Sequence, residues 1–266
     1  MTEDRPRNSH IRQILSHITG KSASYFFTHS NDELSPQQRE IFDHRIHQLS
    51  QGMPLSRILG EREFWSLPFA LNQDTLDPRP DSECLVESVL KYRPDHQASM
   101  RILDLGTGSG CLLISLLSEY KNATGIGVDL SFKALDAARQ NAQSILKDTR
   151  AHFTQSHWFE AVEGLFDVII SNPPYIAQKD YDTLDYHVRG YDPVLALVGG
   201  DDGLQCYREI IEKAGPFLKS SGLLALEIGV HQAQSVSDLL KAHGFTKIKI
   251  EKDLAGIERC LISSYD

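Results

Sequence analysis

Apolar residues in the first part of the chain recur at helical spacing. One helix face is formed by Ile11, Ile14, Leu15 and Ile18. Further on, Ser35, Pro36 and Gln38 have the form of a capping box, with serine as the N-cap and proline in the first turn. We expect the helix that begins there to end at Gly52. It is expected to bury a stripe formed by Ile41, Phe42, Ile46 and Leu49.

From residue 101 onward, short apolar runs alternate with helical patterns. The predicted strands are residues 101–105, 124–129, 151–154, 166–170, 222–228, 245–250 and 258–263. The predicted helices are residues 112–120, 134–146, 203–218 and 232–243. This alternation predicts an α/β protein with a doubly wound, mostly parallel sheet of seven strands. The last two strands have no helix between them, so we expect an antiparallel C-terminal hairpin.

Between the two regions lies a stretch that we interpret as a short hairpin or linker. Residues 63–78 mix aromatic and aliphatic side chains and are interrupted by Pro68 and Asn72. Residues 78–81 end this stretch, and Asp81 is placed to cap the helix that follows. We therefore predict three parts: a small N-terminal helical domain at 1–62, a hairpin linker at 63–80 and the main domain at 81–266.

Composition narrows the class of protein. Of 266 residues, 41% are hydrophobic and 24% charged, which is ordinary for a globular protein and excludes a disordered chain or a disulfide scaffold. Apolar runs such as 111–117 are far shorter than the ~18–20 residues that span a bilayer, and the polar N-terminus predicts no signal peptide. The four cysteines form no Cys-x-x-Cys pair and predict buried thiols in the reducing cytoplasm.

The first candidate site lies where the strand at 101–105 leads into a helix. Glycines there allow a tight turn and a close approach of a ligand to bare backbone, and the helix start offers amide donors. Asp129, at the end of the next strand, is placed to accept hydrogen bonds from ribose hydroxyls, each worth about 1.5–3 kcal/mol to a charged acceptor. The expected cofactor-binding residues of the loop are Gly106, Thr107, Gly108, Ser109 and Gly110.

Three interpretations of this loop remain open. The dinucleotide fingerprint requires Gly or Ala at its sixth position, where this chain has Cys111, and a P-loop requires Gly-Lys-Ser/Thr, which is absent. The spacing G-x-G-x-G with Asp129 suits S-adenosylmethionine better. Binding of NAD and a plain strand–turn–helix without a ligand are the alternatives.

The second candidate site is Asn-Pro-Pro-Tyr at 172–175, directly after the fourth strand. Ligands of open α/β sheets sit between strands one and four, so Asn172 should face a ligand held by the glycine loop. The Asn172 oxygen and the Pro173 carbonyl can each accept one hydrogen of a planar NH₂ group, which would aim its nitrogen at a methyl group. Pro174 stiffens the loop, and Tyr175 offers a flat face to the substrate. The structural alternative is a proline-rich turn with a surface tyrosine.

The residues at 172–175 resemble the amino-methylating branch of the S-adenosylmethionine-dependent methyltransferases, which act on planar NH₂ groups. A closer likeness is to the bacterial release-factor glutamine methyltransferase family, and it runs from about residue 50 to the end. The stretches that carry it are residues 57–60, 63–65, 78–83, 102–110, 172–176, 196–204 and 226–229.

The resemblance implies an enzyme with a Rossmann-like methyltransferase sheet. It would transfer a methyl group from S-adenosylmethionine to the glutamine side-chain nitrogen in the Gly-Gly-Gln motif of class I peptide-chain release factors. The second product would be S-adenosylhomocysteine, and the modification would modulate translation termination. The loop 106–110, Asp129, Trp158 and Asn172 would line the cofactor site. Catalysis and glutamine binding would fall to Asn172, Pro173, Pro174 and Tyr175.

The same resemblance implies how the protein meets its partner. The N-terminal helices would help to dock the release factor, and the protein would be a cytoplasmic monomer with no metal, no membrane contact and no stable binding to nucleic acid. The chain departs from the family's usual pattern at Asp77, usually apolar, at Asp192-Pro193, usually Glu-Pro, and at Ile257-Glu258, usually Arg-Asp.

Two rival functions use the same motifs. A DNA or RNA adenine methyltransferase would act on the amine of a flipped base, but the net charge of −9 weighs against it. A cofactor-binding scaffold without activity is the other rival. A cluster of acids forms either a solvated loop or an acidic rim that repels nucleic acid and favours a basic protein; it consists of Asp180, Asp182, Asp185, Asp192, Asp201 and Asp202.

Overall fold

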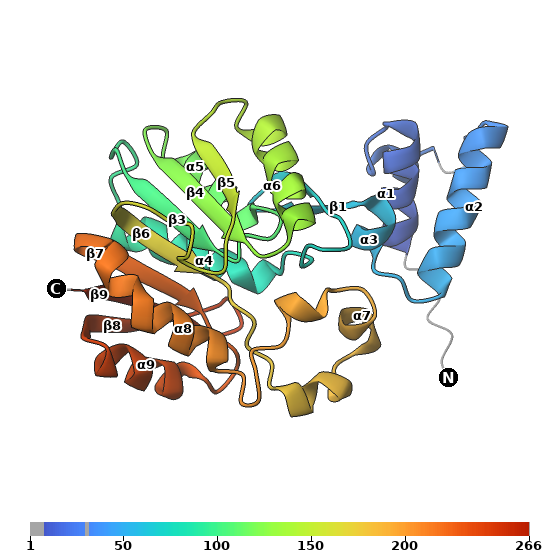
Figure 1. The fold of residues 1–266 in the computed structure, drawn as a ribbon. Coiled ribbons are helices and arrows are strands. Elements are labelled where there is room, and N and C mark those ends of the chain that lie inside the picture. Colours follow the sequence, from blue (N-terminus) through green and yellow to red (C-terminus); the bar gives the residue numbers. More distant parts are fainter. Residues whose placement is uncertain (1–7, 30–31, 266) are drawn as a thin grey trace.

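The structure is a computed structural model that describes residues 8–29 and 32–265. Its larger part is built on a seven-stranded sheet with the order β5-β4-β3-β6-β7-β9-β8, and the N-terminal helices lie to one side of it (Figure 1). The strands are β3 (Arg101–Leu105), β4 (Thr124–Asp129), β5 (Ala151–Gln155), β6 (Phe166–Ser171), β7 (Leu218–Glu227), β8 (Phe245–Lys252) and β9 (Glu258–Tyr265).

Strands β3 to β7 run parallel, and β9 is antiparallel to both of its neighbours, β7 and β8. The prediction of a mostly parallel, doubly wound sheet with an antiparallel C-terminal hairpin is therefore confirmed. The strand order reverses at β3, which has β4 on one side and β6 on the other. The loops that follow β3 and β6 consequently leave the sheet side by side, where open α/β sheets bind ligands.

Helices cover both faces of the sheet and bury two separate cores. One core includes residues of α4 (Glu83–Tyr92), α5 (Cys111–Glu119) and α6 (Phe132–Ile145), and the other includes residues of α8 (Gln205–Ala214) and α9 (Ala233–Ala242). Successive residues of β6 alternate between them, since Val168 and Ile170 belong to the first core and Ile169 to the second. Burial on both faces explains why residues 168–170 of β6 form an unbroken apolar run.

The N-terminal part consists of α1 (Asn8–Thr19), the short helix η1 (Tyr25–Phe27), α2 (Pro36–Ser50) and α3 (Leu55–Leu59). The capping box is present, because Ser35 Oγ accepts from the Gln38 backbone and the Gln38 side chain accepts from the Ser35 backbone. The predicted buried stripe of α2 is wrong: no residue of α2 is buried, and Ile41 is 46% exposed. The reason is that α2 lies at the outer edge of the molecule, packed against α1 and α3 on one side (Figure 1).

A two-stranded hairpin joins the N-terminal part to the sheet. It pairs β1 (Glu61–Phe64) with β2 (Leu67–Ala70) in antiparallel fashion, so a hairpin is present, but it begins two residues before the predicted stretch and ends at residue 70. Phe64 and Phe69 enter the first core, and the Asn141 side chain of α6 accepts from the Ala70 nitrogen at 2.8 Å. The hairpin is thus fixed to the larger part by apolar packing and by a side-chain clamp on its backbone.

The start of α4 corrects one prediction. A short 3-10 turn, η2 (Pro80–Ser82), precedes the helix, so Ser82 takes the N-cap position. Asp81 lies one residue too early to cap α4, and its carboxylate pairs instead with Arg259 Nη2 at 3.4 Å. The segment between β6 and α8 contains three further short helices, η3 (Gln178–Thr183), α7 (Tyr186–Arg189) and η4 (Val194–Ala196), and η5 (Gly215–Phe217) precedes β7. In the part of the chain that is described, no helix is long and apolar enough to cross a membrane.

Candidate active site

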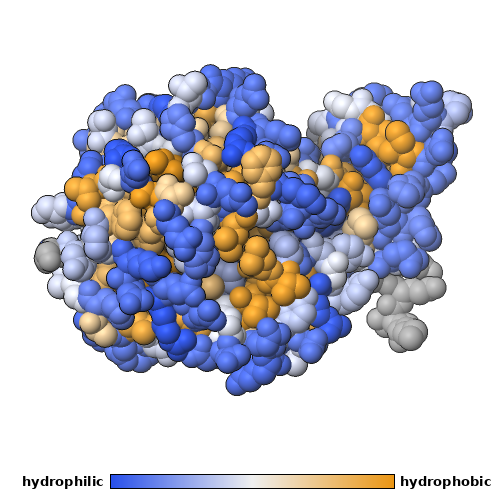
Figure 2. All heavy atoms as spheres, in the orientation of Figure 1, coloured by the Kyte–Doolittle hydropathy of each residue, from blue (hydrophilic) through white to orange (hydrophobic). Residues whose placement is uncertain are grey.

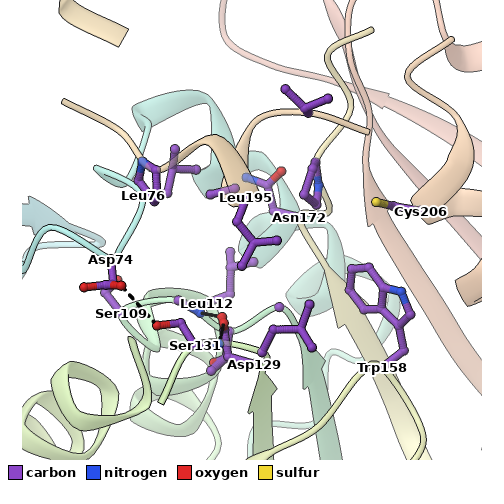
Figure 3. A pocket seen from close by; sticks show the side chains of 18 of the residues that line it. Asp74, Leu76, Ser109, Leu112, Asp129, Ser131, Trp158, Asn172, Leu195 and Cys206 are labelled. Atoms are coloured by element: carbon purple, nitrogen blue, oxygen red, sulfur yellow. Dashed lines mark hydrogen bonds between the residues drawn. The ribbon is translucent and has the colours of Figure 1, made fainter. Parts of the chain in front are cut away.

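A cavity of about 310 Å³ opens beside the ends of β3, β4 and β6. Most of the predicted site residues line it, namely Gly106, Thr107, Gly108, Ser109, Asp129, Trp158, Asn172 and Pro174. In Figure 3, Asn172 and Asp129 lie on opposite sides of the cavity, with Trp158 and Cys206 at one end and Asp74 at the other. The cavity is within the size range of small-ligand sites.

The glycine loop after β3 is pinned at both its backbone and its side chains. The nitrogens of Gly106 and Thr107 both donate to the Val128 carbonyl at 2.9 Å. Thr107 Oγ1 donates to Asp104 Oδ2 at 2.6 Å, and Asp104 is completely buried. Burial raises the pKa of Asp104 to about 7. Asp104 therefore fixes the turn through Thr107, while the loop itself lines the cavity.

Glycine is required at the point where the loop meets Trp158. Gly106 has a φ of +71°, and a Cβ there would lie 3.5 Å from the indole ring. A side chain at this position would fill the gap between the loop and the ring. Trp158 Nε1 donates to Glu209 Oε2 at 2.9 Å, which holds the indole in place. The flat ring and the bare backbone thus lie close together, and both line the cavity.

Gly110 contributes to the packing of the helix that follows the loop. It occupies the N-cap position of α5 and does not line the cavity. A Cβ there would approach Ile114 Cδ1 at 2.8 Å and Ala138 Cβ at 3.2 Å. The absence of a side chain lets α5 pack closely on α6, so we attribute Gly110 to packing and its contact with a cofactor stays a prediction.

Asp129 ends β4 with its carboxylate held by two backbone donors. Oδ2 accepts from the Gly108 nitrogen and Oδ1 from the Ser131 nitrogen, each at 2.9 Å. Burial raises the pKa of Asp129, and these backbone hydrogen bonds partly offset that rise. Each carboxylate oxygen has a second lone pair, so the side chain can accept two further hydrogen bonds from a ligand in the cavity.

The Asn-Pro-Pro-Tyr segment leaves the sheet directly after β6. Asn172 Nδ2 donates to Ser82 Oγ at 3.2 Å, so the amide is already oriented in the protein. Pro173 and Tyr175 do not line the cavity. Tyr175 packs partly buried against the second core, where burial raises its pKa to about 12, and its carbonyl accepts from Gln232 Nε2 at 3.0 Å. Roles for both residues with a substrate stay predictions.

The segment between β6 and α8 forms a wall of the cavity that sequence reasoning did not find. Pro193, Leu195, Ala196 and Val198 line the cavity. Leu195 and its neighbour Val194 are more than half exposed, and Figure 2 shows apolar side chains gathered near the middle of this face. Exposed apolar residues at the mouth of a cavity are typical of a contact surface for a partner.

The acidic cluster predicted for this segment is not uniform. Asp192 is only 7% exposed and accepts from Arg57 Nη2 at 2.6 Å and from Arg79 Nη2 at 2.5 Å. It is therefore neither part of a solvated loop nor part of an acidic rim. The other five acids of the cluster lie at exposed positions. No group of three or more potential metal ligands occurs within residues 8–29 and 32–265.

Similarity to known families identifies the protein as a methyltransferase, and the strand order and the cavity at its reversal fit that class. Residues 61–188 match the methyltransferase small domain family, and residues 2–60 match the PrmC N-terminal domain. A methyltransferase from Pyrococcus furiosus has a similar fold, with a TM-score of 0.55 over 84% of this chain and 96% of that one, at 18% sequence identity.

The chain belongs to the release factor glutamine methyltransferase family, which confirms the resemblance noted in the sequence. It is 41% identical over 253 residues to the release factor glutamine methyltransferase of Agrobacterium fabrum, covering 94% of this chain and 88% of that protein. It is 44% identical over 213 residues to that of Bradyrhizobium diazoefficiens, covering 79% and 72%. The protein is therefore an enzyme that uses a methyl donor.

Proposed function

We propose that this enzyme transfers a methyl group from S-adenosylmethionine to the side-chain nitrogen of the glutamine in the Gly-Gly-Gln motif of class I peptide-chain release factors. The observation that carries the proposal is the oriented amide of Asn172 beside the glycine loop, with its nitrogen bound to Ser82. The oxygen of such an amide is available to accept from a substrate NH₂ group. The names of the relatives from Agrobacterium fabrum and Bradyrhizobium diazoefficiens support the same substrate.

The residues around the cavity fit S-adenosylmethionine. The aromatic ring of Trp158 at the cavity suits a flat base, and the free lone pairs of Asp129 suit ribose hydroxyls. When bound, this donor supplies a methyl group activated by a sulfonium charge. The part of the protein is to hold the substrate nitrogen in line with that methyl group, since positioning alone can account for several kcal/mol of a barrier (about 7–11 kcal/mol in the best oriented cases).

An amide nitrogen is a weak nucleophile because its lone pair is delocalised into the carbonyl group. Asn172 Oδ1 and the Pro173 carbonyl would accept its two hydrogens and stabilise the positive charge that develops as the nitrogen gains a methyl group. The nitrogen becomes more acidic as it does so, and its proton can then leave to water. The protein therefore has to orient the substrate nitrogen and stabilise its developing positive charge, which a stiff proline-containing turn can do.

We expect the replacement of Asp129 by alanine to weaken binding of the donor. Loss of two hydrogen bonds to a charged acceptor, at about 1.5–3 kcal/mol each, corresponds to a rise in Kd of at least about 100-fold. Isothermal titration calorimetry with S-adenosylhomocysteine measures this directly. The matched control is Asp136→Ala on the outer side of α6, where the carboxylate pairs with Arg139. Equal affinities in both variants would argue against the ribose contact.

The function is tested by incubating the enzyme with an intact release factor and S-adenosylmethionine, followed by mass spectrometry of the Gly-Gly-Gln peptide. We expect one added methyl group on the glutamine, and none when that glutamine is replaced by alanine. Parallel reactions with DNA and RNA oligonucleotides test methyl transfer to adenine. Methylated adenine together with an unmodified release factor would overturn the proposal.

Within this function, the exposed apolar pair Val194 and Leu195 is suited to contact the release factor beside its glutamine. The N-terminal helices would add a second contact, and we further propose a monomeric enzyme that works in the cytoplasm without stable binding to nucleic acid. The exposed carboxylate of Asp201, near this wall in the sequence, favours a basic protein surface over a phosphate backbone, whereas Asp202 is paired with Arg208.

A further inference from the structure

The amide of Asn172 has two chemically different ends. Only its oxygen can accept a hydrogen from a substrate NH₂ group, while its nitrogen only donates. Rotation of the amide by half a turn exchanges the two ends with almost no change in shape. Some neighbouring group must therefore keep the Asn172 oxygen turned toward the substrate.

Strand pairing brings Glu227 next to Asn172. Strands β6 and β7 are parallel, and Ser171 pairs with Leu226, so the next residues, Asn172 just beyond β6 and Glu227 at the end of β7, lie at the same level. Glu227 is only 1% exposed, and its Oε2 atom has no hydrogen-bond partner among the described residues. Side-chain hydrogen bonds from Ser82 and from Asn172 favour its ionised form.

Ser82 lies between these two side chains. It holds the N-cap position of α4, yet its hydroxyl makes no capping hydrogen bond, and it is 3% exposed. Instead Ser82 Oγ accepts from Asn172 Nδ2 at 3.2 Å, and hydrogen bonding from Ser82, more than from Asn172 itself, lowers the pKa of Glu227. A hydroxyl has a single hydrogen, so once it donates to the carboxylate it can only accept from Asn172.

We propose that Glu227 is a positioning residue whose carboxylate, acting through Ser82, keeps the Asn172 oxygen turned toward the substrate nitrogen. A carboxylate cannot donate, so the hydrogen bonds run in one direction, from Asn172 to Ser82 to Glu227. A group at position 227 that can also donate removes this constraint, because Ser82 can then donate to the Asn172 oxygen and the amide can turn. The inference rests on the proposed function, in which that oxygen accepts from the substrate amide.

The direction of hydrogen bonding makes the reaction sensitive to pH. Burial raises the pKa of Glu227 to about 7. The rise is reduced by hydrogen bonding from Ser82, by the charge of Arg259 and by hydrogen bonding from Asn172, and it is reinforced by the charge of Asp81. The other titratable groups that interact with it are Tyr175, Tyr207, Cys111 and Cys260. Because the ionised form prevails above the pKa, we expect kcat to be full at higher pH and to fall as the pH drops through about 7.

The test replaces Glu227 with glutamine, which keeps the size of the side chain and adds a donor. Methylation of an intact release factor is followed in single turnovers at pH values on both sides of 7, and the Kd of S-adenosylhomocysteine is measured alongside. We expect kcat above pH 7 to fall about 10- to 100-fold, the decline of kcat at low pH to disappear, and the Kd to stay at its wild-type value. Asp253→Asn is the matched control, since Asp253 is also buried and pairs with Arg259 at 3.2 Å but does not contact Asn172.

The outcomes are distinct. A Glu227→Gln enzyme with wild-type kcat and an unchanged pH profile overturns the role of Glu227. If circular dichroism shows that this variant does not fold, Ser82→Ala decides: a reduced kcat with wild-type Kd supports the relay, and an unchanged kcat overturns it. A wild-type enzyme that binds S-adenosylhomocysteine but leaves the release factor unmethylated overturns the proposed function itself, and the role of Glu227 with it.

Discussion

Replacement of Asn172 by alanine is expected to reduce the rate of methyl transfer by about 10²–10³-fold, the usual effect of removing one group that stabilises charge in a transition state. The substitution deletes the amide oxygen proposed to accept from the substrate nitrogen. The Kd of S-adenosylhomocysteine should change only modestly, because the glycine loop, Asp129 and Trp158 stay in place. Single-turnover methylation of a release factor and calorimetry with S-adenosylhomocysteine measure the two quantities.

The same variant separates catalysis from folding. Asn172 is partly buried and donates to Ser82, so its loss leaves one hydroxyl without that partner and should cost about 1 kcal/mol of stability. Asn141→Ala is the control for loss of an amide, since the Asn141 side chain donates to the carbonyls of Ala70 and Ser109 and does not line the cavity. We expect this control to lower the melting temperature more than Asn172→Ala and to lower the rate less. Near-normal turnover in folded Asn172→Ala would remove the basis of the mechanism.

Much of the fold and the centre of the site follow from local sequence signals. The middle of β6 is continuously apolar because both of its faces are buried, and β3 and β4 alternate with helical patterns, so the positions of all three strands could be predicted. Loops that follow adjacent parallel strands must leave the sheet together. The glycine loop and Asn172 therefore had to meet, and the cavity lined by both confirms that placement.

What the sequence could not predict depends on long-range pairing. Ser82 stands at a helix start and Glu227 at the end of an apolar strand, and nothing local relates either of them to Asn172. The register between β6 and β7 makes that connection, since it places Glu227 level with Asn172. Local patterns also predicted too much burial for α2, because helical periodicity identifies an apolar face but not whether a neighbour covers it.

The burial of Asp192 was also beyond prediction from local sequence, because it depends on residues far away in the chain. Sequence reasoning grouped it with exposed acids, whereas the structure buries it between two arginines from distant motifs, Arg57 of α3 and Arg79 before η2. Arg57 also donates to the carbonyls of Asn72 and Thr75 at 2.7 Å. One carboxylate thus ties the N-terminal helices and the linker to the wall that contains Leu195.

Two of the departures from the family pattern meet in this network. The Asp77 nitrogen donates to Asp192 Oδ1 at 3.2 Å, and Ser56 Oγ donates to Asp77 Oδ2 at 2.6 Å. Asp77 is 4% exposed, and at this usually apolar position only its Oδ2 accepts a hydrogen bond, while Oδ1 has no hydrogen-bond partner among the described residues and lies 3.7 Å from Arg62 Nε. The departures therefore change how the parts are held together and leave the glycine loop and Asn172 untouched.

Replacement of Asp192 by alanine should accordingly be among the most destabilising single changes in the chain. It leaves the Arg57 guanidinium, whose side chain is 9% exposed, without its carboxylate, and removal of one partner of a buried ion pair costs about 3–5 kcal/mol. For a chain of this size that corresponds to a fall in melting temperature of roughly 6–20 °C. Differential scanning calorimetry measures the shift.

Asp202→Ala provides the matched control, because it removes another aspartate of the same segment from an arginine. The Asp202 and Arg208 side chains are 49% and 48% exposed, and such surface pairs contribute about 0–1 kcal/mol. Equal shifts in the two variants would show that burial of Asp192 does not stabilise the wall. Leu195, in the wall proposed to contact the release factor, lies only three residues from Asp192. If the Asp192→Ala enzyme loses affinity for a release factor but keeps its Kd for S-adenosylhomocysteine, the hydrogen bonds of Asp192 hold that wall in position.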